Sequence, residues 1–159
     1  MPRDMLRLIG AETPEHWKEA RHLIERYAAS LDFDLDFQDF VHELDSLPGD
    51  YGPPNGAFLL AQQNDRFVGC VALRKCSDRT CEMKRLYVAP DQRNQGIGRS
   101  LVEAIITAAG SLGYERMLLD TVPSMEAART LYASLGFTPT EAYRYNPIPG
   151  ATFMELCLR

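Results

Sequence analysis

Apolar positions in the first 50 residues follow two different spacings. Met5 to Ala11 reads as a strand, and Thr13-Pro14 provides a polar cap and a proline, which is how helices often begin. Apolar residues then recur at helical spacing, at Trp17, Ala20, Leu23, Ile24, Tyr27 and Leu31. A shorter helix is predicted from about Phe37 to Leu47, and the loop GDYGPPNG ends it.

From residue 57 the apolar period changes to two, which is typical of strands. Three such runs follow one another, at Ala57 to Gln62, Arg66 to Lys75 and Thr80 to Val88. The spacers between them are short and rich in Asn, Asp and Ser, so the runs predict an antiparallel meander. Ala89-Pro90 ends the third run.

Helical spacing returns in two later segments, each ended by a glycine and an aromatic residue. The first carries Ile97, Leu101, Val102, Ile105, Ile106, Ala109 and Leu112, and the second carries Ala127, Ala128, Leu131, Tyr132 and Leu135. Gly113-Tyr114 and Gly136-Phe137 predict left-handed helix caps. A strand from Arg116 to Val122 lies between these helices.

This order of elements predicts an α/β (α+β) fold with a mixed sheet and helices on both faces. The strands before and after the helix that carries Ile97 to Leu112 should be parallel, and this helix should connect them in a right-handed crossover. The chain has 159 residues, of which 45% are hydrophobic, so we expect residues 1–159 to form a single domain.

The net charge of −5 argues against a nucleic-acid partner, because such binding relies on Lys and Arg. No signal sequence or membrane span is expected, so no membrane partner and a cytoplasmic location are predicted. The four cysteines and three histidines lack metal-binding spacing, and we expect no metal. Cys76 and Cys81 could meet across a turn, although reduced thiols are the default in a cytoplasm.

The stretch DQRNQGIGRSLV, from Asp91 to Val102, places two glycines at the head of a predicted helix. Glycine at a helix N-terminus lets a phosphate approach the unpaired amides, so Gly96 and Gly98 suit a pyrophosphate. No lysine follows the glycines as in a P-loop, and Leu101 occupies the third glycine position of a dinucleotide fingerprint. Tight packing of the loop on a strand is the alternative explanation.

The segment LYVAPDQRNQGIGRSLVEAI, from Leu86 to Ile105, closely resembles the acyl-CoA-binding segment of the GNAT superfamily of N-acetyltransferases. Arg93, Gly96 and Gly98 occupy the three fixed places of its Gln/Arg-x-x-Gly-x-Gly/Ala motif. A second element resembles the family's helix with a tyrosine followed by Gly-Phe: Ala128-x-x-Leu131-Tyr132-x-x-x-Gly136-Phe137. The resemblance implies a central mixed, mostly antiparallel twisted sheet flanked by helices on both faces.

The resemblance also implies how acetyl-CoA binds as a cosubstrate. The strand before the motif splays from its neighbour at a bulge, and the pantetheine arm pairs with its exposed edge, here Leu86, Tyr87 and Val88. Their side chains could still belong to the core. The pyrophosphate then meets the backbone of the loop and helix start, at Arg93, Asn94, Gln95, Gly96, Gly98 and Arg99. One departure is Met125, where family members often carry an asparagine.

The implied chemistry is direct attack of an amine on the thioester. By analogy, the Val88 N–H would stabilise the tetrahedral oxyanion. A phenol can protonate a departing thiolate, so Tyr132 is the candidate acid, although it could instead be a core residue with its hydroxyl bound to a carbonyl. Glu82 is the leading candidate base, with a cross-strand ion pair as the alternative. Asp120 is the second candidate base.

These features together indicate an acetyl-CoA-dependent N-acetyltransferase acting on a primary amine of a small molecule or peptide. The alternative is a non-catalytic acyl-CoA-binding regulatory module. An RNA-modifying enzyme would conflict with the acidic charge. Family resemblance makes a homodimer an expectation.

The acidic stretch LDFDLDFQDFVHELDSLPGD, from Leu31 to Asp50, lies where the family's helical arm overhangs the acceptor. It could be a solvated surface whose phenylalanines pack inward. Alternatively, one or two of its carboxylates could face the cleft and attract a cationic substrate.

Overall fold

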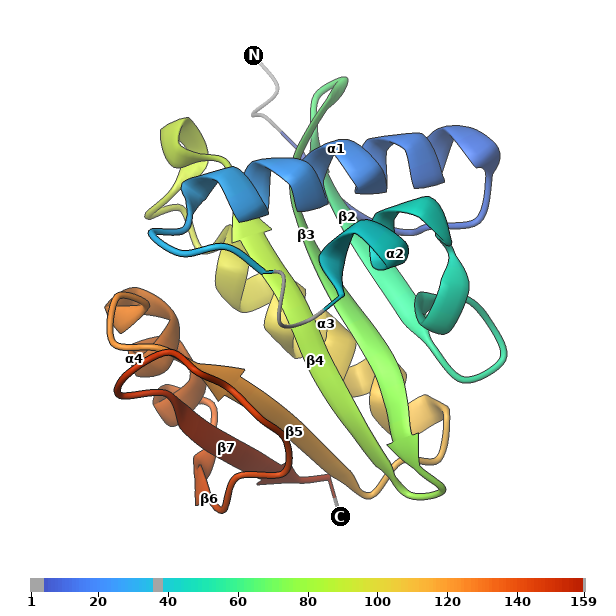
Figure 1. Cartoon of the computed structure of the whole chain (residues 1–159). Helices are drawn as coiled ribbons and strands as arrows, with labels where there is room; N and C mark the ends of the chain where they lie inside the picture. Colours follow the sequence, from blue (N-terminus) through green and yellow to red (C-terminus); the bar gives the residue numbers. More distant parts are fainter. Residues whose placement is uncertain (1–4, 36–38, 159) are drawn as a thin grey trace.

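The computed structural model describes residues 5–35 and 39–158, and its strands form one seven-stranded sheet in the order β1-β2-β3-β4-β5-β7-β6 (Figure 1). The strands are β1 (Leu6–Gly10), β2 (Ala57–Gln63), β3 (Arg66–Ser77), β4 (Thr80–Val88), β5 (Arg116–Thr121), β6 (Thr138–Thr140) and β7 (Thr152–Cys157). The helices are α1 (Pro14–Ser30), α2 (Phe40–Asp45), α3 (Ile97–Ser111) and α4 (Glu126–Ser134), with single 3-10 turns η2 (Gly49–Tyr51) and η3 (Pro90–Gln92).

The sheet is mixed because one neighbouring pair of strands is parallel. β1 to β4 pair antiparallel in sequence order, which confirms the meander. β4 and β5 are parallel and are connected through α3, as the strand, helix, strand pattern predicts. β7 then inserts antiparallel between β5 and β6.

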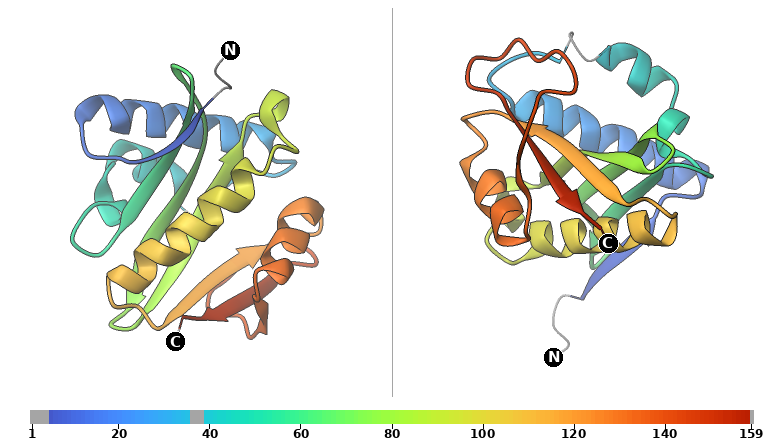
Figure 2. Two further views of the ribbon diagram at one scale, coloured as in Figure 1. Left: turned by 180° about the vertical axis from the view of Figure 1, so that it is seen from behind. Right: turned by 90° about the horizontal axis from the view of Figure 1, so that it is seen from below.

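Helices cover both faces of the sheet (Figures 1 and 2). One core lies under α1 and α2 and includes Leu23, Ile24, Leu44, Phe58 and Leu60. The other lies under α3 and α4 and includes Leu101, Val102, Ile105, Met117 and Tyr132. The predicted α/β architecture with helices on both faces is therefore confirmed.

Helix boundaries follow the local signals in the sequence. Thr13 caps α1 and its hydroxyl accepts a hydrogen bond from the His16 N–H, with Pro14 as the first helical residue. Gly113 and Gly136 adopt left-handed φ values of 91° and 99°, and both form the predicted C-terminal caps.

α2 is shorter than the helix predicted from Phe37 to Leu47. It spans Phe40–Asp45, and Phe37 lies outside the described residues. The chain leaves the helix early, through Ser46 and the turn η2, because a proline and a glycine follow at positions 48 and 49. Cys76 and Cys81 are both free thiols, so they do not pair across their turn.

β4 and β5 diverge strongly after a short contact (Figure 1). Their register contains three pairs, which join Thr80, Cys81 and Glu82 to residues 116–118. Within the described chain, the rest of β4, from Met83 to Val88, has no partner strand on this side. The sheet therefore consists of two halves, β1 to β4 and β5 to β7, that open away from a short seam.

Candidate active site

A cavity of about 560 Å³ lies where the two halves of the sheet diverge. Its walls come from the free edge of β4, the start of α3, the end of β5, one face of α4 and the end of α1. Such a volume is typical of small-molecule and cofactor sites.

A β-bulge at Arg85 shapes the free edge of β4. Cys70 pairs with Tyr87 but Ala72 pairs with Lys84, so two residues of β4 oppose one residue of β3. Arg85 is one of these two, and its φ of 62° lies in the left-handed region that non-glycine residues rarely adopt.

Buried contacts hold Arg85 in this conformation. Its guanidinium donates two hydrogen bonds to Glu43 of α2, at 2.8 and 2.7 Å, and the Arg85 side chain is only 1% exposed. The rings of Tyr27 and Phe40 each lie 5.6 Å from the guanidinium carbon. The Arg85–Glu43 pair thus connects α2 to the bulge in the cavity wall.

Replacing Glu43 with glutamine should strongly destabilise the fold. The Arg85 charge would stay buried without a counter-ion, a change that costs about 3–5 kcal/mol in comparable buried pairs. Burial opposes ionisation of Glu43, but the hydrogen bonds and charge of Arg85 outweigh it and hold the pKa of Glu43 below its ordinary value.

This pKa shift determines how the contribution of Glu43 to the stability of the fold depends on pH. The stabilisation is present above the unfolded pKa of about 4.3 and is lost as pH falls through the lower folded pKa. Urea unfolding from pH 7 to pH 3 should therefore show a smaller acid-induced loss in Glu43→Gln than in the parent. An equally stable variant would mean that the pair contributes nothing.

Successive N–H groups of a strand point to opposite edges, and near the end of β4 this leaves one amide facing the cavity between β4 and β5. The Ala89 N–H bonds the Val68 carbonyl of β3 at 2.8 Å, so the preceding Val88 N–H points to the opposite side. The Val88 carbonyl lies on that side as well, where it accepts a hydrogen bond from Arg93 Nε at 3.0 Å. Leu86, Tyr87 and Val88 all line the cavity.

The two glycines have different structural roles at the start of α3. Gly96 is the N-cap residue, and its φ of 80° lies in the left-handed region that favours glycine. Gly98 has an ordinary helical backbone, and a Cβ there would lie 3.7 Å from Val88 and 3.8 Å from Leu131, which are normal contact distances. The protein's own packing therefore does not demand glycine at position 98.

The first amides of α3 are available to a ligand. The first intrahelical bond runs from the Ser100 N–H to the Gly96 carbonyl, and the N-cap residue Gly96 has no side chain with which to cap the helix. Within the described part of the chain, the three N–H groups before Ser100 have no partner, and with the positive end of the helix dipole they suit an anion beside Gly98.

The loop residues named from the sequence divide into two groups. Arg93, Asn94, Gly96 and Gly98 line the cavity, whereas Gln95 and Arg99 are not among its lining residues. The Arg99 side chain instead donates a hydrogen bond to Ser134 Oγ at 3.1 Å, which joins α3 to α4.

Tyr132 lines the cavity from α4 and is 6% exposed. Its ring packs against Phe137, with centroids 5.7 Å apart, so the ring does contribute to the core. Among the described residues, however, its hydroxyl has no hydrogen-bond partner. Burial raises the pKa of Tyr132, and the nearby Tyr27 and Asp120 raise it further, so the hydroxyl keeps its proton at neutral pH.

Glu82 forms the cross-strand ion pair that was the alternative to a catalytic role. It is fully buried, pairs with Arg74 Nε at 2.8 Å, and is not among the residues that line the cavity. The Tyr143 hydroxyl donates to the same carboxylate, and Arg144 forms an ion pair with it. The Glu82 carboxylate is thus held by two hydrogen bonds and one further ion pair, away from the cavity.

Asp120, the second candidate base, differs from Glu82 because it lines the cavity. It lies near the end of β5, lines the cavity with Tyr132, and accepts a hydrogen bond from Asn146 Nδ2 at 3.0 Å. The loop from Glu141 to Ala151 carries this asparagine, and no motif in the sequence indicated its role.

Lys84 also lines the cavity, although the sequence analysis did not select it. It is 7% exposed, and burial followed by the charges of Arg85 and Arg74 lowers its pKa to about 7. The available signal was the run Glu82-Met83-Lys84-Arg85, which places three charges in a central strand where apolar residues are the rule.

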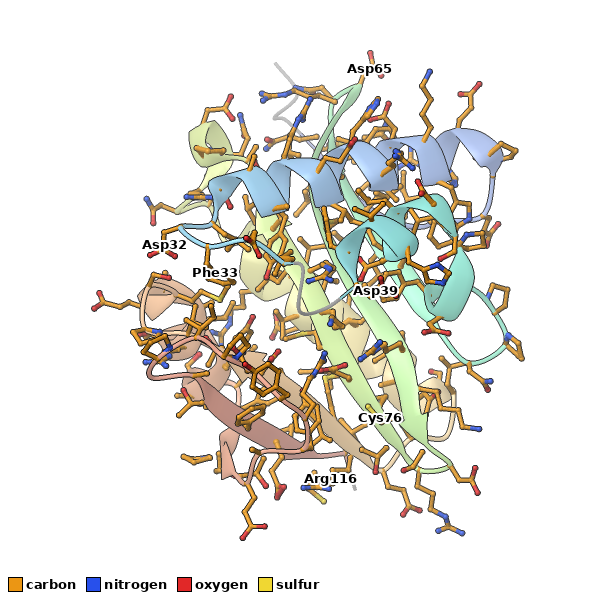
Figure 3. All side chains as sticks on the ribbon, in the orientation of Figure 1. Asp32, Phe33, Asp39, Asp65, Cys76 and Arg116 are labelled. Atoms are coloured by element: carbon orange, nitrogen blue, oxygen red, sulfur yellow. The ribbon has the colours of Figure 1, made fainter. Side chains whose placement is uncertain are left out.

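Members of the acidic stretch have separate surroundings. Asp32 lines the cavity, whereas Glu43 is bound to Arg85 and Asp45 lies 3.7 Å from Arg21. Figure 3 shows Asp32 near α4, while Asp39 lies closer to α2. Asp36 lies outside the described residues.

The residues that line the cavity fit acetyl-CoA. An anion site at the start of α3, an open backbone edge on β4 and a protonated phenol occur along one continuous cavity. In the described part of the chain, no group of three or more His, Cys, Asp or Glu side chains could hold a metal ion. No helix within these residues has both the length and the apolar character needed to cross a membrane.

Comparison with known proteins agrees with this geometry. The model of the acetyltransferase (GNAT) family matches residues 14–137, so the chain belongs to this family. An uncharacterized N-acetyltransferase of Schizosaccharomyces pombe is 38% identical over 151 residues, which cover 94% of this chain and 93% of that protein.

Solved structures share the whole fold. A GNAT-family acetyltransferase from Staphylococcus aureus superimposes with a TM-score of 0.78 at 20% identity and covers 98% of this chain and 100% of its own. An acetyltransferase from Salmonella typhimurium, solved with its cofactor acetyl-CoA, gives a TM-score of 0.70 at 21% identity, with coverage of 97% and 94%. The chain therefore has the GNAT fold.

Proposed function

We propose that this protein is an acetyl-CoA-dependent N-acetyltransferase that moves the acetyl group directly to a primary amine of a small molecule or peptide. The observation that carries the proposal is the continuous cavity that joins the open start of α3, the free edge of β4 and the buried hydroxyl of Tyr132. Family membership supports the same activity.

Acetyl-CoA, when bound, supplies a thioester that an amine can attack. The amides at the start of α3 would hold its pyrophosphate, and the edge from Leu86 to Val88 would pair with its pantetheine arm. The Val88 N–H would then donate to the oxygen that gains charge during attack. Tyr132 would return a proton to the sulfur that leaves.

We assign removal of the amine proton to Asp120. An alkyl ammonium group has a pKa near 10.4, so most of the acceptor is protonated at neutral pH and must lose a proton before attack. Asp120 shares the cavity with Tyr132, whereas Glu82 is fully buried, accepts two hydrogen bonds and forms an ion pair with Arg144.

Asp120→Asn should lower turnover at least tenfold at pH 7 and less at pH 10, because a free amine no longer needs the base. Glu82→Gln serves as the comparison, and we expect it to change stability without this change in pH profile. A pH-rate profile of Asp120→Asn parallel to that of the parent would remove Asp120 from the reaction.

The overall proposal is tested by incubating the protein with acetyl-CoA and a panel of amines while free thiol release is measured. Amine-dependent release, with an acetylated product found by mass spectrometry, would support it. Binding of acetyl-CoA without release for any amine would instead favour the non-catalytic acyl-CoA-binding module. The possible homodimer and the cytoplasmic location stay predictions.

A further inference from the structure

Two carboxylates lie on the same face of the sheet, where the seam between β4 and β5 ends. Glu82 pairs in register with Leu118, and Asp120 lies two residues further along β5, so the pleat places both carboxylates on one face. Glu82 is fully buried outside the cavity, whereas Asp120 lines it. The loop between β6 and β7, residues 141–151, contacts both of them.

This loop supplies each carboxylate with a different kind of partner. It lies on the side of the sheet that α1 and α2 cover (Figure 2). Tyr143 donates a hydrogen bond to Glu82, and Arg144 adds an ion pair. Asp120 instead accepts a hydrogen bond from a neutral group, Nδ2 of Asn146, at 3.0 Å. The loop thus provides a positive charge for Glu82 and an uncharged donor for Asp120.

The side-chain amide of Asn146 is bound at both ends. Its Oδ1 accepts a hydrogen bond from the Ile148 N–H at 3.0 Å, which closes a turn within the loop. Its Nδ2 then faces Oδ2 of Asp120. If the amide turned over, its NH2 group would meet the Ile148 N–H and its oxygen would meet the carboxylate, so both bonds would be lost. The two bonds therefore fix the same orientation of Asn146.

Further contacts hold the loop on both sides of Asn146. Before it, the Tyr143 ring packs edge-on against Phe153 of β7, with centroids 5.3 Å apart. After it, Gly150 lies so close to Pro123 that a Cβ at Gly150 would come within 2.6 Å of the proline Cγ. Asn146 therefore has a defined place relative to β5.

A general base must be held in place, because a displacement of about 1 Å can lower a rate 100-fold. We propose that Asn146 is a positioning residue that holds the Asp120 carboxylate toward the amine of the acceptor. The inference rests on the proposed N-acetyltransferase function, in which the ammonium nitrogen gives its proton to Asp120 and keeps the electron pair that attacks the thioester. A cation in place of Asn146 would favour the ionised carboxylate and make it a poorer proton acceptor.

Asn146→Ser separates the bond to Asp120 from the fold of the loop. A serine hydroxyl can still accept from the Ile148 N–H, but the side chain is one bond shorter and loses the contact with Asp120. With the amine that gives the fastest thiol release, this variant should lower kcat about tenfold at pH 7. The KM for acetyl-CoA and the acetyl-CoA-induced rise in melting temperature should stay unchanged. Asn55→Ser is the matched control, because Asn55 is exposed and outside the cavity, and it should keep the parent's kcat.

Two measurements distinguish a role through Asp120 from a general loss of structure. In the Asp120→Asn background, Asn146→Ser should cause no further loss of kcat, because residues that act as a unit are not additive. The loss caused by Asn146→Ser should also become smaller from pH 7 to pH 10, as for Asp120→Asn, because a free amine no longer needs the base. A general structural defect would lower kcat equally in both backgrounds and at both pH values.

Other titrating groups around Asp120 come from four elements. Burial is the main cause that raises the pKa of Tyr27 at the end of α1 and of Tyr132 on α4, and the Asp120 charge adds to both. Burial and then Asp120 also raise the pKa of Tyr143 in the loop. Burial lowers the pKa of Lys84 on β4 to about 7, against the attraction of Asp120. None of these four groups is altered in the variants, so each variant is compared with the parent at the same pH.

Each outcome decides the inference. A loss of kcat in Asn146→Ser that disappears in the Asp120→Asn background and becomes smaller at pH 10 supports it. A kcat equal to that of the parent, or the same loss in both backgrounds, would overturn it while the N-acetyltransferase proposal stands. If the parent releases thiol with no amine, the enzymatic function and this inference are rejected together.

Discussion

Replacing Gly98 with valine should abolish the rise in melting temperature that acetyl-CoA causes in the parent protein. A ligand that binds only the folded state stabilises it by mass action, so the shift reports binding directly. A Cβ at position 98 fits between Val88 and Leu131, so the variant should fold. The further methyl groups of valine would occupy the space beside the α3 amides where a phosphate would lie.

Gly110→Val is the matched control for this prediction. Gly110 lies in the same helix, and a Cβ there would meet nothing within 4 Å. Both variants place a β-branched residue in the helix, which lowers helix stability in each, but only position 98 lines the cavity. If Gly98→Val binds acetyl-CoA as tightly as the parent, the phosphate does not bind at this helix start.

Tyr132→Phe should preserve acetyl-CoA binding and lower turnover by a factor of about ten to a thousand, the range expected for loss of one positioned acid. The packing against Phe137 is unchanged, because only the hydroxyl is removed. Burial holds the pKa of Tyr132 above its ordinary value, so the parent should lose no activity through its ionisation up to about pH 10.

Tyr114→Phe provides the comparison for Tyr132→Phe. The Tyr114 hydroxyl donates to the Asn55 carbonyl at 2.6 Å and lies outside the cavity, so its loss should reduce stability but leave turnover intact. A rate for Tyr132→Phe equal to that of the parent would assign Tyr132 to the core alone.

Elements with strong local signals were predictable from the sequence. Thr13 and Pro14 fix the start of α1, and Gly113 and Gly136 fix the ends of α3 and α4, because each residue acts on the backbone within a few positions of itself. The three strands of the meander follow from their period and short turns.

The charged part of the site was less predictable, because it depends on contacts between distant segments. Glu82 meets Arg144 only when the loop between β6 and β7 folds against β4, and Glu43 meets Arg85 only when α2 packs on the bulge. No local pattern distinguishes Lys84, which lines the cavity, from Glu82, which does not. Resemblance to a family selected loop residues that line the cavity, such as Gly96 and Gly98, but not these partners.

The short seam between β4 and β5 has a mechanical consequence. Each half of the sheet is a continuous stretch of chain, residues 6–88 and 116–157, and between these stretches the chain passes through α3 (Figure 2). The two halves are thus joined along three residue pairs, and α3 packs mainly on the first half. A cofactor that fills the cavity would contact β4 on one half and β5 and α4 on the other, so the stiffness of the assembled site would come partly from the cofactor itself.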